Sequence, residues 1–169
     1  MKKILTLLFT ILVLTACTEV TKNEINKEEI NKEEINKEEI NKDKVTNNNY
    51  KFIGESEHWK AEYSYKGTET WGDNDGTKTY SNKDSYEFIL KYKGSLEELS
   101  SMQKLEYSFK TLTSSGEATE EFTDPPKELI FTSKGSSEGG AKVNEDEVIQ
   151  VNVKWDEFEE SFELYNKNK

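Results

Sequence analysis

The chain has 169 residues, of which 34 are acidic and 23 are lysine with no arginine, so its formal net charge is −11. Affinity for nucleic acid depends on clustered cations, and this composition therefore argues against a nucleic-acid partner. One His, His58, and one Cys, Cys17, are present. Most thiol, zinc and nucleophile-based hydrolase chemistries lack the side chains that they need, so the sequence predicts a protein that is not an enzyme and holds no cofactor or metal.

Residues 1–16 are predicted to be an export signal. The first three residues include two lysines, and residues 4–16 are a largely apolar run without charge. As a helix this run would be about 20 Å long, short of the ~30 Å hydrocarbon core of a membrane. A basic start followed by a short apolar run and small residues is typical of a secretory signal.

Residues 1–17 resemble a bacterial lipoprotein signal peptide, because the sequence LTAC at residues 14–17 matches the lipobox. The resemblance implies cleavage between Ala16 and Cys17 and attachment of a diacylglyceryl group to Cys17. Two acyl chains give stable anchoring where one does not. We therefore expect the mature protein to be held by lipid on the extracellular face of the cell membrane. Since no other Cys follows Cys17, its fold cannot depend on disulfide bonds.

Residues 17–49 are predicted to be a spacer in which the motif EEINK recurs every five residues. Five residues advance a helix by about 140° beyond a full turn, so the apolar residues form no stripe that could face a core or a coiled-coil partner. Glu and Lys four residues apart favour a solvated helix, whereas the lack of an apolar face favours disorder. Both interpretations remain open, and under either one the segment separates the lipid from a domain.

Residues 50–169 hold all nine glycines, both prolines and all but one of the aromatic residues, so they form the part that can build a core. Apolar and polar residues alternate here with the period of a β-strand, between clusters of Gly, Asp, Asn, Ser and Pro. The pattern predicts an all-β fold: a single antiparallel β-sandwich, immunoglobulin-like, or a barrel-like domain of seven to nine strands. The alternating runs include residues 59–65, 86–92, 105–109, 151–155 and 162–164.

One short exception to the strand pattern is expected at residues 95–99. Ser95 stands three residues before Glu98, which is the spacing of a capping box at a helix start. The spacing predicts a single helical turn that crosses between sheets.

Parts of the domain resemble a group of small lipoproteins from Gram-positive spore-formers. The similarity rests on GESEHW at residues 54–59, GGA at residues 139–141 and the closing hairpin over residues 151–164. The resemblance implies the same fold and the same envelope location, and it implies no activity.

Aromatic residues at strand ends are the candidate ligand-binding groups. Trp71 and Tyr80 flank an Asp-rich turn, and Trp155 ends a strand. Such rings stack on sugars or fill a partner's pocket, although they also close the ends of small sandwiches. The sequence thus predicts a non-catalytic interaction module for another envelope protein or an extracellular ligand; the alternative is a carbohydrate-binding lipoprotein of the cell wall. Because the domain is acidic, a cationic or neutral partner is expected.

His58 and two acidic segments are weaker candidates. A lone His without a Cys or Ser–Asp partner is more often a surface or turn residue than a base or a metal ligand. The DNDG sequence at residues 73–76 suggests a calcium loop, but that template requires Gly at its sixth position, where Lys78 stands. The turn is therefore predicted to close a hairpin, with calcium binding left open, and the acidic run at residues 144–147 is predicted to be a solvated loop.

Overall fold

The computed structural model describes residues 43–168, which include eight β-strands and no helix. The described residues do not include the predicted signal sequence with Ala16, nor Cys17, nor most of the predicted spacer. The strands are β1 (Lys44–Glu55), β2 (Trp59–Asn74), β3 (Thr77–Tyr92), β4 (Lys104–Lys110), β5 (Ser115–Glu121), β6 (Ile130–Glu138), β7 (Ile149–Trp155) and β8 (Phe158–Asn166).

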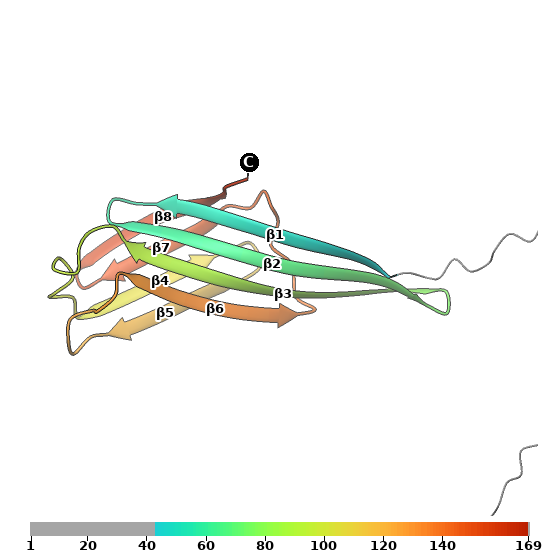
Figure 1. The fold of residues 1–169 in the computed structure, drawn as a ribbon, viewed down its shortest axis with the longest axis horizontal. Helices are drawn as coiled ribbons and strands as arrows, with labels where there is room; N and C mark the ends of the chain where they lie inside the picture. Colours follow the sequence, from blue (N-terminus) through green and yellow to red (C-terminus); the bar gives the residue numbers. More distant parts are fainter. Residues whose placement is uncertain (1–42, 169) are drawn as a thin grey trace, which may run out of the picture. The chain divides into compact units, whose positions relative to one another are not determined.

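The strands form one antiparallel sheet in the order β5-β4-β7-β8-β1-β2-β3-β6. β1 and β8 join the two halves of this sheet through only two residue pairs, Phe52 with Asn166 and Ile53 with Tyr165. The halves lie across from each other, so that the sheet is nearly closed and barrel-like (Figure 1). The predicted all-β sandwich or barrel of seven to nine strands is confirmed.

The hydrophobic core lies between the two halves of the sheet. Inward-facing residues alternate with outward-facing ones, as in β7, where Ile149, Val151, Val153 and Trp155 are buried. Phe109 of β4 crosses the interior, with its ring 5.2 Å from that of Tyr63 and 4.9 Å from that of Phe88. Each such fully buried side chain contributes on the order of 1.5–3 kcal/mol to folding, so these cross-sheet contacts hold the halves together.

The connection from β3 to β4 contains the predicted capping box, in hydrogen-bonded turns rather than a helix. The backbone N–H and the hydroxyl of Ser95 both donate to Glu98 Oε1 at 3.1 Å, and the Glu98 N–H donates to Ser95 Oγ at 3.4 Å. Leu99 and Met102 then enter the core. The spacing predicted the local bonding correctly, but the segment continues as separate turns, in which the Ser100 N–H donates to the Glu97 carbonyl and the Met102 N–H donates to the Leu99 carbonyl.

The ends of β1, β2 and β3 extend past the core as a three-stranded arm, here defined as residues 44–49, 66–74 and 77–85 (Figure 1). β1 begins at Lys44, which pairs with Trp71, so the strand includes residues 44–49 that were predicted to be spacer. These residues show no apolar alternation, and within residues 43–168 five of these six side chains are exposed rather than covered by another element. Backbone pairing with β2, rather than burial, makes them a strand.

Candidate functional site

Trp71 and Tyr80 form an exposed aromatic pair on the arm. They lie opposite each other in the register of β2 and β3, with ring centroids 4.5 Å apart and ring planes at 50°. The two residues are 49% and 46% exposed. The structure therefore brings together two of the three aromatic residues that were predicted to bind a ligand.

A polar network around Glu69 fixes one side of this pair. Glu69 is two residues before Trp71 on the same face of β2, and it accepts hydrogen bonds from Tyr80 Oη at 3.2 Å and from Asn48 Nδ2 at 2.8 Å. Lys142 Nζ lies 2.8 Å from Glu69 Oε1. The hydrogen bond from Lys142 lowers the pKa of Glu69, with Asn48 adding to the effect, so the carboxylate stays charged.

The loop between β6 and β7 supplies Lys142 and is itself attached to the arm. Asn82 Nδ2 donates to the carbonyl of Gly140 at 2.6 Å, and the Gly139 N–H donates to the Asn82 carbonyl at 3.0 Å. Gly139 has a φ of 73°, a conformation that suits glycine at this bend. The arm face is named here as Asn48, Glu69, Trp71, Tyr80 and Lys142.

Trp155 does not join the arm face. It is only 8% exposed, its ring stacks on Phe158 at 5.5 Å, and it meets Trp59 at 5.6 Å. Trp59 begins β2, about 40 Å along the strand from Trp71. In the structure Trp155 therefore closes one end of the core, as small sandwiches commonly use such a residue.

The Asp-rich turn at residues 73–76 closes the hairpin between β2 and β3. Asp75 and Gly76 both have positive φ, 51° and 82°, as a two-residue hairpin loop requires. The Gly76 N–H donates to Asp73 Oδ1 at 2.7 Å, and Lys78 Nζ lies 3.0 Å from Asp73 Oδ2. Both carboxylate oxygens of Asp73 thus stabilise the turn itself, in agreement with the hairpin interpretation.

The acidic run at residues 144–147 contains one buried carboxylate. Glu147 is 5% exposed, and its carboxylate accepts hydrogen bonds from the backbone N–H groups of Leu112 and Asn144. It therefore ties the loop after β4 to the loop before β7. Sequence reasoning assigned the whole run to solvent, because nothing local signals a partner 35 residues away.

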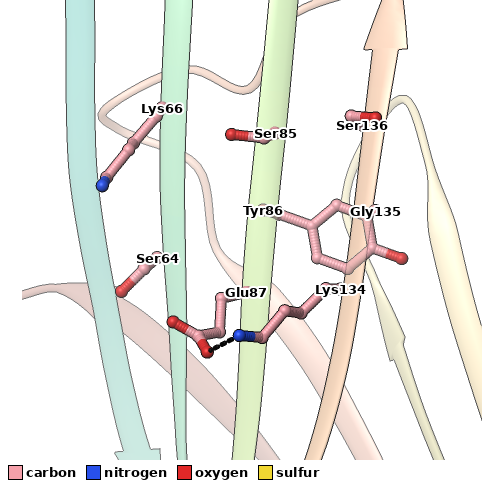
Figure 2. A pocket seen from close by; sticks show the side chains of 8 residues that line it. All are labelled: Ser64, Lys66, Ser85, Tyr86, Glu87, Lys134, Gly135 and Ser136. Carbon is pink, nitrogen blue, oxygen red and sulfur yellow. Dashed lines mark ion pairs between the residues drawn. The ribbon is translucent and has the colours of Figure 1, made fainter.

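A shallow pocket of about 490 Å³ lies over β2, β3 and β6 (Figure 2). Its lining includes three serines, two lysines and one glutamate, and Lys134 Nζ lies 2.8 Å from Glu87 Oε1. Its hydroxyl groups have no His or Cys beside them within the lining.

His58 has a partner that the sequence did not indicate. Its Nδ1 lies 2.5 Å from Oε1 of Glu160, which is 102 residues away on β8. This hydrogen bond raises the pKa of His58, and bonds from Ser56 and His58 lower the pKa of Glu160 against the opposing effect of its burial. Only the pairing of β8 with β7 and β1 brings Glu160 to the turn after β1.

No family model, curated protein or solved structure matches the chain. Within residues 43–168, no helix has the length and apolar character needed to cross a membrane. The described part of the chain is an all-β domain that carries the exposed Trp71–Tyr80 pair on a projecting arm.

Proposed function

We propose that the chain is a lipid-anchored envelope protein whose β-domain is a non-catalytic interaction module for another envelope protein or an extracellular ligand. The lipobox and spacer support the anchored location, and the arm face supports binding. In this proposal the arm face is the contact surface and the barrel is its rigid support.

The observation that carries the proposal is the half-exposed Trp71–Tyr80 pair. Strand register sets the position of both backbones, and the bond to Glu69 orients the Tyr80 ring. Because these rings are already ordered, a partner that covers them loses little additional side-chain entropy. Trp and Tyr are also enriched among the residues that contribute most to binding energy at protein interfaces.

Binding to cell-wall glycan is the second candidate function. Saccharides present apolar ring faces beside hydroxyl groups, and the arm face offers aromatic rings beside the carboxylate of Glu69, the amide of Asn48 and the ammonium of Lys142. The same residues therefore suit stacking together with hydrogen bonding.

Two retention experiments with residues 38–169, the compact unit that holds all eight strands, test and separate these functions. The immobilised domain is exposed to envelope extract and, separately, to purified wall glycan fragments. The variants are Trp71→Ala and Tyr80→Ala, and Tyr165→Ala on β8 is the matched control because it is also exposed, at 55%.

Retention of one protein that falls at least tenfold in both arm variants, but not in the control, supports the interaction module. Retention of glycan alone with the same dependence supports the second function instead. Equal retention by all variants would reject the arm face as the contact surface.

The anchoring half of the proposal is tested on the full chain by metabolic labelling with a fatty acid. Label on the parent chain and its loss in Cys17→Ser are expected, because Cys17 is the acceptor that the lipobox specifies. Persistent label on the Ser variant would contradict the lipid anchor and leave the arm-face experiments unaffected.

A further inference from the structure

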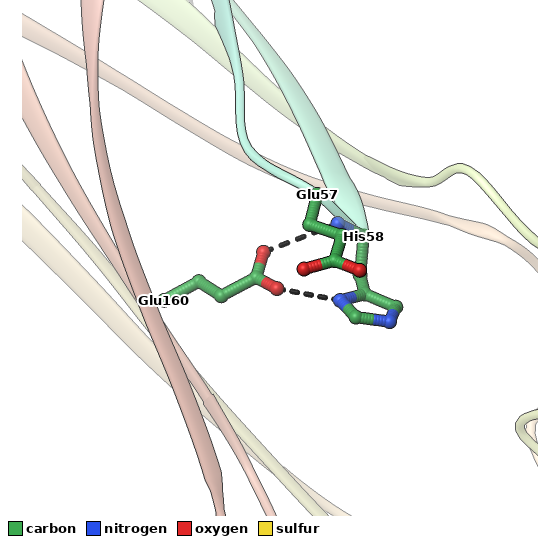
Figure 3. A group of neighbouring side chains, drawn as sticks. All are labelled: Glu57, His58 and Glu160. Carbon is green, nitrogen blue, oxygen red and sulfur yellow. Dashed lines mark hydrogen bonds and ion pairs between the residues drawn. The ribbon is translucent and has the colours of Figure 1, made fainter.

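Three potential metal ligands meet where the turn between β1 and β2 approaches β8. Glu57 and His58 come from the turn and Glu160 from the strand, and Figure 3 shows the Glu160 carboxylate pointing toward the His58 imidazole with Glu57 near both. One ligand atom from each residue lies within 4.8 Å of the other two. The lone His of the chain thus lies beside two carboxylates.

The position of these ligands is set by the fold. The backbone N–H of His58 donates to Glu160 Oε2 at 3.2 Å. The N–H of Ser56 donates to the Trp59 carbonyl at 2.8 Å, and this bond closes the turn. The His58 ring stacks near Tyr92, with centroids 6.3 Å apart and planes at 15°, and it lies 5.7 Å from the ring of Trp155. Two ligands are therefore held by a strand, a tight turn and two aromatic rings before any ion arrives.

The surrounding charge favours a cation. Glu98, whose carboxylate accepts a bond from Tyr92 Oη at 3.1 Å, adds negative charge near His58. The ammonium of Lys93 is paired with groups outside the cluster: it donates to the Ser56 carbonyl at 2.9 Å and lies 3.6 Å from a Glu55 oxygen. Two carboxylates and a neutral imidazole would balance the charge of a divalent ion.

We propose that Glu57, His58 and Glu160 form a binding site for a divalent transition-metal ion, and specifically for Zn²⁺. Zn²⁺ accepts imidazole nitrogen and carboxylate oxygen at about 2.0–2.2 Å, so neighbouring ligand atoms around it are about 3.4 Å apart. The three groups reach this arrangement if His58 and Glu160 part by about an ångström and the exposed side chain of Glu57 turns inward. Mg²⁺ and Ca²⁺ prefer oxygen ligands alone, which this set does not provide.

The ion would cross-link the β1–β2 turn to β8, five residues along β8 from Tyr165 at the junction between the two sheet halves. It would leave its fourth coordination position for water, because Glu57 is exposed and the His58 side chain is 42% exposed. This inference is independent of the proposed function and of the arm face.

The test is calorimetric titration of ZnCl₂ into untagged residues 38–169, together with thermal melts. One saturable site and a rise in melting temperature of several degrees are expected, because an ion that binds the folded state stabilises it. Ca²⁺ and Mg²⁺ should produce neither effect. CoCl₂ should give a visible absorption band of low-coordinate Co²⁺.

The variants are His58→Ala, Glu160→Gln and Glu57→Gln, and Glu163→Gln is the control because it removes a carboxylate from the same strand outside the cluster. At least a tenfold loss of Zn²⁺ affinity is expected in each of the three and none in the control. Glu57 is exposed, so its variant keeps the test valid if another variant folds poorly. Absence of saturable binding, equal binding in all variants, or equal affinity for Ca²⁺ would overturn the site.

Discussion

The two ends of β2 and β3 differ in what covers their inner face. At the core end Trp59 is 0% exposed and contacts Tyr92, Phe131 and Trp155, whereas at the arm end Trp71 is 49% exposed and contacts Tyr80. Both Trp residues occupy inward positions of the same alternating strand. The alternation thus determines which side a residue faces, and the opposite sheet half determines whether that side is buried.

The largest effect that distinguishes the two ends is expected from truncating each Trp. Trp59→Ala should lower the free energy of unfolding by about 3–5 kcal/mol, because it empties a large site inside the core. Trp71→Ala should change it by less than about 1 kcal/mol, because Trp71 is half exposed. Urea unfolding followed by circular dichroism measures both values. Equal losses of unfolding free energy would show that Trp71 contributes as much to stability as Trp59 does.

A substitution at the junction of the sheet halves is expected to have the next largest effect. A Cβ at Gly54 of β1 would overlap the backbone oxygen of Glu163 on β8, and a backbone cannot move aside as a side chain can. Gly54→Ala should therefore lower the free energy of unfolding by at least about 1–3 kcal/mol in the same urea experiment. Gly140→Ala is the control, because its new methyl group would meet only the hydroxyl side chain of Ser137. A fully stable Gly54→Ala protein would mean that the junction is not closely packed.

A smaller and local effect is expected at the tip of the arm. Gly76 has a φ of 82° and open space around it, so Gly76→Ala costs about 1 kcal/mol through backbone strain alone. Hydrogen exchange should become faster for amides near Trp71 and stay unchanged near Trp59, which serves as the internal reference. Faster exchange at both places would indicate that the arm and the core unfold as one unit.

Removing repeat residues is expected to have no effect on domain stability. The described core lies within residues 43–168, and deletion of residues 28–42 removes none of them. The melting temperature of residues 18–169 should therefore be the same with and without the deletion, as measured by circular dichroism. A fall of several degrees would show that the repeat packs on the domain and would contradict its interpretation as a spacer.

The sequence predicted the parts of the fold in which one face of a strand is covered. The alternation in residues 59–65 and 151–155 is the alternation of burial that the structure shows. It did not predict β5, because Ser115–Glu121 is an edge strand with no large apolar residue, nor the first six residues of β1. Backbone pairing forms both segments, and backbone pairing leaves little trace in composition.

The candidate sites were predictable only where both members of a contact lie close in sequence. Trp71 and Tyr80 flank one hairpin turn, so their proximity followed from the turn chemistry at Asp75 and Gly76. The bonds from His58 to Glu160 and from Lys142 to Glu69 join residues 102 and 73 positions apart. Such pairs depend on strand order and loop path, which a single sequence does not specify.

The long register between β1 and β2 has a mechanical consequence. β1 enters the domain at the arm tip and pairs with β2 over twelve residues, from Lys44 to Glu55. A force that pulls Lys44 outward along the axis of β1 loads those backbone hydrogen bonds together, in shear, rather than breaking them one after another. Forced unfolding is governed by the unfolding rate, which shear loading keeps low. A domain tethered through its first strand in this way would stay folded while flow or a bound partner pulls on it.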